Sequence, residues 1–293
     1  MNTIRAYMML IGTALCWGGH AVINRIAVGE ISPMLLVMLR WLGVVILVSI
    51  FANKYIRQDW PILKKHLPYL FCMGALGYAI FNAIFYVSGH YTRAINIGIL
   101  QGSIPVFVLL GSFIAYQTRI SSLQTIGVLV TILGVCTVSF GGYGFDKASF
   151  TFATGDILMI VACVLYAGYT IGLRNRPSCS SLGLFAMLAF SALLTSLPFV
   201  AGEYALGNLQ CPTPKGWIIV GLVTLFPSFL AQIFFIKGVE TIGPGRAGVF
   251  VNLVPVFAAI LAVTVLNEPF EIFHAAALVL VLGGIYLSER SKP

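Results

Sequence analysis

The chain has 293 residues, of which 59% are hydrophobic and only 9% are charged, and its mean hydropathy is +0.97. A soluble domain typically carries about 25% charged residues, so this chain has too little polar surface to cover a water-soluble globule. The composition therefore excludes a cytosolic enzyme, a DNA-binding protein and a disordered chain. The net charge of +8 is interpreted as membrane topology rather than as a nucleic-acid interface, because basic residues collect in cytoplasmic loops.

Ten apolar runs predict an all-α integral membrane protein. A transmembrane helix needs about 20 apolar residues, and ten such helices with short connectors account for most of the chain. A β-barrel is not expected, since its strands show alternating segments of about ten residues, whereas these runs are long and continuous. The runs cover residues 7–28, 34–53, 67–89, 94–117, 123–140, 154–173, 182–202, 216–239, 244–266 and 270–288.

The distribution of Lys and Arg predicts that both termini lie in the cytoplasm of a bacterial inner membrane. With the N-terminus inside, twelve of these residues fall on the cytoplasmic side and four on the other, as the positive-inside rule requires. The cytoplasmic set is Arg5, Lys54, Arg57, Lys64, Lys65, Arg119, Arg174, Arg176, Lys237, Arg246, Arg290 and Lys292. The opposite set is Arg25, Arg93, Lys147 and Lys215.

An internal repeat divides the ten runs into two sets of five. Pro-Val-Phe occurs at 105–107 and again at 255–257, and Gly98 pairs with Gly248 at the same offset of 150. Each half holds an odd number of helices, so the second half must enter the membrane upside down relative to the first. Inverted repeats are typical of secondary transporters, whose site lies at the repeat interface near the midplane. The predicted domains are two five-helix repeats, residues 1–145 and 146–293.

Several short segments, taken as an ordered set, carry a family resemblance. They include Leu39-Arg40-Trp41 early in the second run, the two Pro-Val-Phe helices, and Asn267-Glu268-Pro269 between the last two runs. In this order the segments resemble the EamA family of the drug/metabolite transporter superfamily. In the first half Gln117-Thr118-Arg119 stands where the family's acidic hinge would fall, which counts against a mechanism that needs matching acidic hinges.

The resemblance implies ten helices in two inverted halves around a central cavity. The first four helices of each half would form the cavity, and the fifth helix of each would lie at the periphery or in a homodimer contact. Typical family cargo is amino acids, their analogues and other small metabolites, usually exported.

No sequence motif indicates an enzyme. HExxH, P-loop and Gly-x-Ser-x-Gly patterns are missing from the sequence, and the six cysteines contain no CxxC. We therefore expect no catalytic residue, no cofactor and no metal. The expected partners are the lipid bilayer and a small-molecule substrate.

Polar and aromatic residues inside the apolar runs are the candidate lining of a substrate cavity. Trp17, His20 and Asn24 share one face of the first helix because they are spaced three and four residues apart. Pro105 and Pro255 each remove a helical hydrogen bond and would leave irregular backbone at membrane depth, which is tolerated only beside protein or a watery cavity. The predicted substrate-binding residues are Trp17, His20, Asn24, Arg40, Tyr78, Asn82, Gln101, Tyr166, Tyr169, Gln232 and Asn252.

Each of these residues also has a purely structural interpretation. Hydrogen bonds between helices in a membrane contribute about 0.6 kcal/mol each, and the same side chains can serve that purpose. Arg40 either captures a substrate carboxylate or holds helix ends together, because a charge at that depth needs a partner. His20 either relays protons or is a neutral, hydrogen-bonded histidine.

The sequence predicts a secondary transporter that exports amino acids or related small metabolites by alternating access around a midplane cavity. One alternative is an importer or exchanger of a small organic anion, with Arg40 and His20 as the charge contacts. A second alternative, from a different class, is a non-transporting membrane scaffold or a channel.

Overall fold

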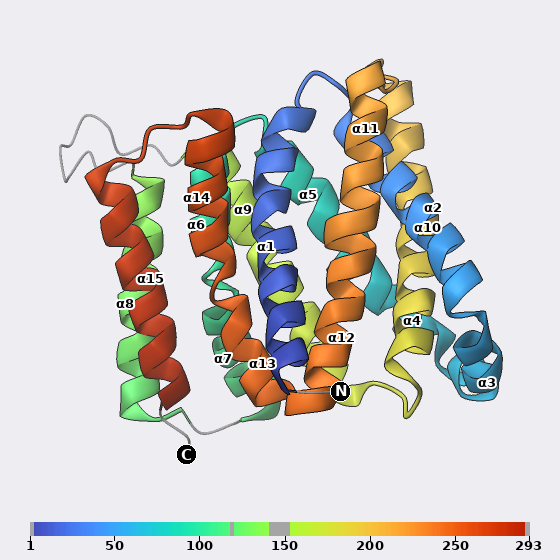
Figure 1. Cartoon of the computed structure of the whole chain (residues 1–293), viewed down its shortest axis with the longest axis horizontal. Helices are drawn as coiled ribbons and strands as arrows, with labels where there is room; N and C mark the ends of the chain where they lie inside the picture. Colours follow the sequence, from blue (N-terminus) through green and yellow to red (C-terminus); the bar gives the residue numbers. More distant parts are fainter. Residues whose placement is uncertain (1–2, 118–119, 141–152, 291–293) are drawn as a thin grey trace.

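The computed structural model describes residues 3–117, 120–140 and 153–290, and the regular secondary structure of these residues is entirely helical. Ten segments are long and apolar enough to cross a membrane, which confirms the predicted ten-helix membrane fold. They stand side by side in one bundle (Figure 1). The predicted domain boundary at 145 and three of the predicted loop cations, Arg119, Lys147 and Lys292, lie outside the described residues.

The first half contributes five spans. The third span joins several helical pieces, and the fourth consists of two helices. The elements are α1 (Thr3–Ala27), α2 (Pro33–Phe51), α3 (Asn53–Leu63), η1 (Lys64–His66), α4 (Leu67–Gly74), η2 (Ala75–Ile80), α5 (Phe81–Ser88), α6 (Ala94–Gln101), α7 (Ile104–Tyr116) and α8 (Ser122–Ser139).

The second half repeats this pattern. Its third span is again interrupted, and its fourth again consists of two helices. The elements are α9 (Thr154–Gly172), η3 (Leu173–Asn175), α10 (Ser181–Ala205), α11 (Pro214–Val223), η4 (Thr224–Leu230), α12 (Ala231–Ile242), α13 (Pro244–Val251), α14 (Val254–Leu266) and α15 (Ile272–Arg290).

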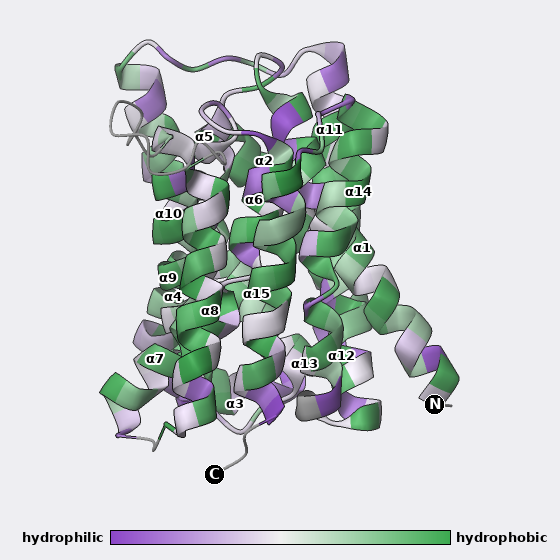
Figure 2. Cartoon of the chain, turned by 90° about the vertical axis from the view of Figure 1, so that its left-hand side faces the viewer, coloured by the Kyte–Doolittle hydropathy of each residue, from purple (hydrophilic) through white to green (hydrophobic). Residues whose placement is uncertain are grey.

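Both chain termini lie at the same end of the bundle, called here the terminal end; the other is the far end (Figure 1). Hydrophobic residues cover the middle of the helices, and hydrophilic residues gather toward both ends (Figure 2). This distribution matches a bilayer that surrounds the middle of the bundle. The orientation of the two ends relative to the cell stays a prediction.

The irregular points of the two halves match in sequence position. A π-helical turn occupies Ala75–Ile80 in one half and Thr224–Leu230 in the other. The fourth span of each half breaks before its proline, between α6 and α7 and between α13 and α14. Gln117 and Asn267 both end a helix in the left-handed region, each at φ 53°. These shared departures from regular helix support the predicted duplication, while the inverted relation of the halves stays a prediction.

Helix α3 is a feature that the sequence analysis placed in a connector. It lies at the terminal end beside the start of α10 (Figure 1). Leu63 is its buried residue, whereas Trp60 and Tyr55 are exposed among Lys54 and Arg57. A helix with mixed polar and apolar faces contains no continuous apolar run, so the apolar runs in the sequence did not predict α3.

Helices α8 and α15 pack against each other at one edge of the bundle (Figure 1). A Cβ atom added at Gly127 would lie 2.5 Å from the carbonyl oxygen of Gly284, and one added at Gly134 would lie 2.9 Å from the backbone nitrogen of Val281. Glycine therefore permits the close approach of these two backbones. The homodimer contact implied for these helices stays a prediction.

Candidate functional site

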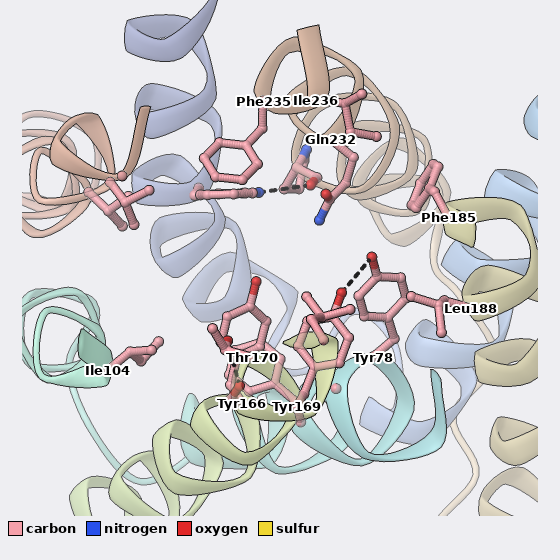
Figure 3. Close-up of a pocket in the computed structure, with 18 of the residues that line it drawn as sticks. Tyr78, Ile104, Tyr166, Tyr169, Thr170, Phe185, Leu188, Gln232, Phe235 and Ile236 are labelled. Carbon is pink, nitrogen blue, oxygen red and sulfur yellow. Dashed lines mark hydrogen bonds between the residues drawn. The ribbon is translucent and has the colours of Figure 1, made fainter. Parts of the chain in front are cut away.

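A cavity of about 740 Å³ lies between the two halves. Its walls come from the first four spans of each half, and Glu289 of α15 lies at its rim. Ten of the eleven predicted substrate-binding residues line it, all except Asn24. Figure 3 shows Tyr166 and Tyr169 of α9 directed into the same space as Tyr78 of the third span and Gln232 of α12.

The cavity opens toward the terminal end. Arg176, Glu240 and Glu289 line it there, and all three are exposed. Its deepest lining residues include His20 and Arg40, which are 6% and 3% exposed. The connectors of the far end contribute no described lining residue, so the cavity is open at one end and closed at the other.

Aromatic rings form one wall of the cavity. The Tyr78 ring stacks on Trp41, with centroids 4.8 Å apart and an interplanar angle of 5°. Tyr169 lies 5.4 Å from Tyr78 and 5.3 Å from Tyr166, measured between ring centroids. The Tyr169 hydroxyl donates to the Tyr78 hydroxyl over 3.4 Å. This wall offers flat apolar surface with hydroxyl groups at its edge, which suits a ligand with both apolar and polar parts.

Arg40 occupies the deep end of the cavity and is held by neutral groups. Its Nε donates to Ser228 Oγ at 2.9 Å, and its Nη1 donates to Asn82 Oδ1 at 2.5 Å and to the Tyr86 hydroxyl at 2.9 Å. The guanidinium carbon also lies 5.1 Å from the Trp41 ring centroid. Among the described residues, no carboxylate lies within ion-pair distance of this buried cation.

His20 belongs to the same cluster. Its Nε2 lies 2.7 Å from the Tyr86 hydroxyl and 3.1 Å from Nη1 of Arg40. These contacts place the edge of the His20 ring against the Arg40 guanidinium and the Tyr86 hydroxyl. The ring also stacks on Phe85 at 4.4 Å. The sequence analysis placed Asn24 on the same helix face, but Asn24 lies deeper than the cavity and donates to the Phe85 carbonyl at 2.7 Å.

The remaining predicted residues provide polar groups along the walls. Gln101 and Gln232 line the cavity, and neither side chain has a hydrogen bond to another described residue. Asn252 donates to Glu289 Oε1 at 3.3 Å near the opening. The Trp17 indole donates to the Pro227 carbonyl at 3.2 Å, within the π-helical turn of the second half. The two glutamines are therefore available to a ligand.

Several residues that complete the site lie outside the predicted set. Trp41 and Ser228 line the cavity, and Tyr86 binds both Arg40 and His20. One signal was available for Ser228, because it follows Tyr78 by the repeat offset of 150. Tyr86 follows Asn82 by four residues, so the sequence places it on one helix face with Tyr78 and Asn82. Trp41 requires knowledge of how α2 is rotated, which a single sequence does not provide.

Carboxylates close the far end by linking the two halves. Glu203 accepts hydrogen bonds from the Ser32 hydroxyl at 2.6 Å and from the Met34 and Leu35 amides at 3.2 and 3.3 Å. Glu268 accepts from the backbone amides of residues 94 and 95 at 2.9 and 3.0 Å. Each of these carboxylates therefore satisfies free N–H groups at the start of a helix in the other half.

Three more acidic groups join the halves at this end. Asp156 accepts from the Thr92 hydroxyl at 2.5 Å, and Glu271 pairs with Arg93 at 3.5 Å. Glu30 pairs with Lys215 at 3.2 Å and also accepts from the hydroxyl of residue 213. That hydroxyl and the Lys215 ammonium lower the pKa of the Glu30 carboxyl below its usual value.

This fold and site define a helical membrane transporter, with ten spans around a cavity that is open at one end. The model of the EamA-like transporter family matches residues 4–140 and 153–290, and the chain belongs to this family.

Several curated proteins resemble the chain along nearly its whole length, and solved structures resemble it as well. The uncharacterized transporter YetK of Bacillus subtilis is 28% identical over 98% of this chain and 87% of its own. The uncharacterized inner membrane transporter YedA of Escherichia coli is 23% identical over 97% of this chain and 90% of its own. A solved crystal structure superposes with a TM-score of 0.63 at 17% identity, covering 96% of this chain and 95% of that one, and this likeness shows the fold alone.

Proposed function

We propose that the protein carries small organic metabolites, amino acids or related compounds, out of the cell by alternating access around the central cavity. In this proposal both termini lie in the cytoplasm of a bacterium, so the open end of the cavity faces the inside. The charge distribution supports this orientation, because the described loop cations concentrate at the terminal end.

The observation that carries the proposal is a cavity that both halves build and that opens at one end only. A channel needs a path through the bundle, whereas a carrier needs a site that faces one side at a time. The volume of about 740 Å³ lies within the range of about 300–1,000 Å³ that is usual for small-molecule sites. The tyrosines and the two unpartnered glutamines offer apolar surface and hydrogen-bonding groups together, which suits compounds of amino-acid size.

Counterflow in proteoliposomes tests this function. Vesicles that contain the purified protein are loaded with an unlabelled amino acid, and the entry of the same labelled amino acid is measured. We expect internal amino acid to accelerate the entry of label. A channel would give flux without this acceleration, and a scaffold would give no flux, so either result would reject the proposal.

A pair of tyrosine variants provides the matched control. Tyr166 lines the cavity, whereas Tyr286 lies on α15 and is 56% exposed on the outside of the bundle. Because loss of one aromatic contact costs about 0.5–1.5 kcal/mol beyond its area, Tyr166→Ala should lower counterflow by roughly tenfold. Tyr286→Ala should leave counterflow nearly unchanged.

A further inference from the structure

We infer that Arg40 binds a carboxylate group of the cargo through its Nη2 atom, so that a free carboxylate is a condition for recognition. This inference rests on the proposed function, because it concerns the cargo of the same cavity. It narrows the substrate class to organic acids, including zwitterionic amino acids, and excludes amines, amides and neutral metabolites.

The first support is the hydrogen bonding of the guanidinium. Nε and Nη1 are occupied by Ser228, Asn82, Tyr86 and His20. Nη2 makes no hydrogen bond to a described residue, and it is not among the fully buried polar atoms that lack a partner. Because Arg40 lines the cavity, the accessible surface of Nη2 faces the cavity. Two N–H donors therefore face the space that the cargo would occupy.

The second support is the charge balance at the deep end. Arg40 is 3% exposed, and its four side-chain partners are neutral in the arrangement described. A buried cation without a counter-ion is costly, and a carboxylate is the group that best matches the planar fork of a guanidinium. The acidic residues that line the cavity, Glu240 and Glu289, are exposed at its opening. An incoming carboxylate would supply the missing charge.

The third support is a second unused donor beside Arg40. The indole Nε1 of Trp41 is buried and has no hydrogen-bond partner among the described residues, and Trp41 lines the same cavity. The immediate surroundings of Arg40 therefore hold more donors than acceptors. An acceptor-only group such as a carboxylate fits this imbalance, whereas an ammonium group would increase it.

The experiment compares related ligands on the wild-type protein. The twenty common L-amino acids are screened by thermal unfolding of the purified full-length protein, because a ligand that binds the folded state raises Tm. For each amino acid that raises Tm, three compounds are then tested: its carboxamide, the amine that lacks the carboxylate, and the acid that lacks the amino group. We expect the carboxamide and the amine to lose the Tm shift.

The acid that lacks the amino group separates two kinds of carboxylate cargo. If this acid keeps the Tm shift, the site accepts organic anions in general. If it loses the shift while the amino acid keeps it, the site requires a zwitterion, and both results support the inference. A carboxamide as effective as its amino acid would overturn the inference and leave the proposed function standing. If no compound raises Tm and counterflow is also absent, both the inference about Arg40 and the proposed transport function are rejected.

Substitution of Asn82 by aspartate tests Arg40 without removing it. Asn82→Asp changes the acceptor of Nη1 into a carboxylate of the same shape and gives Arg40 an internal counter-ion. The Asn82 amide nitrogen also donates to the Tyr78 carbonyl at 2.5 Å, a bond that aspartate cannot make, so the Tm of the ligand-free variant is measured first as a check on folding. We expect the folded variant to bind the carboxylate ligand roughly 10- to 100-fold more weakly, because hydrogen bonds to charged groups are strong. Unchanged binding of the amino acid by Asn82→Asp would contradict the inference, even if an Arg40→Gln variant failed to fold.

Discussion

Among the described residues, five carboxylates link one half of the chain to the other at the far end of the bundle, whereas one does so at the terminal end. The terminal-end link is Asp59, which accepts from the backbone amide of Ser180 at 3.0 Å and from its hydroxyl. Other contacts between the halves there include the hydrogen bond from Tyr69 to the Gly172 carbonyl at 2.8 Å and the Arg174 guanidinium, whose carbon lies 4.4 Å from the Tyr116 ring centroid. The cavity opens at the end with fewer charged links.

The kind of contact at the far end indicates how this closed end could open. Hydrogen bonds exchange with water on opening, so each contributes only about 0.5–1.5 kcal/mol net, or 1.5–3 when one partner is charged. Close apolar packing has no such replacement in water. A far end held by carboxylates on helix N-termini can therefore separate in steps if the proposed alternating access occurs.

The largest expected effect comes from Glu203, because its carboxylate accepts three hydrogen bonds from the other half. Glu203→Ala would leave the amides at the start of α2 without their partner, since the Ser32 side chain does not cap this helix itself. We expect the free energy of unfolding to fall by about 2 kcal/mol, as measured by denaturant titration in detergent.

Glu240 offers a matched control for Glu203. It is an exposed glutamate near the terminal end and accepts no hydrogen bond from a described residue. Glu240→Ala should change the free energy of unfolding by less than about 0.5 kcal/mol, as is usual for surface positions. Equal losses in the two variants would show that the links at the far end are no stronger than an unbonded surface carboxylate.

Glu268 is expected to give a smaller loss. Its carboxylate accepts two backbone hydrogen bonds at the start of α6, one fewer than Glu203 accepts. We expect Glu268→Ala to lower the free energy of unfolding by about 1 kcal/mol in the same titration. Glu268→Gln keeps one acceptor oxygen and should lose less. A loss larger than that of Glu203→Ala would contradict the expectation, because two hydrogen bonds at the start of α6 would then stabilise more than three at the start of α2.

These carboxylates also show where prediction from sequence reached its limit. Ten spans and the breaks before Pro105 and Pro255 follow from hydropathy and from the removal of a helical hydrogen bond, which are local properties. The sequence analysis singled out Glu268 as part of a hinge motif. Its contact with α6 joins residues 174 positions apart, and no local pattern encodes such a contact.

The candidate site likewise combines residues that local sequence spacing predicts with residues that depend on how the helices pack. Trp17 and His20 were predicted because their spacing places them on one helix face, and both line the cavity. Asn24 has the same spacing but lies beyond the closed end, because a shared face does not determine how deep the cavity reaches. Trp41 was not predicted because its side-chain direction depends on the rotation of α2 against its neighbours.

The smallest expected effect concerns Glu30 and depends on pH. Its pKa in the folded protein lies below the usual value, so the stabilising contact is fully present above about pH 4.5 and is lost as the pH falls below that value. The unfolded chain takes up the proton first, and this uptake favours unfolding. The Tm of Glu30→Gln should therefore lie slightly below that of the wild type at pH 7, and the difference should shrink as the pH falls toward 3.5. Lys215→Met removes one of the groups that lower the pKa, so the pH-dependent loss of Tm should be smaller in this variant and should end at a higher pH. A difference between Glu30→Gln and wild type that stays constant across this range would show that the ionised carboxylate does not hold the far end together.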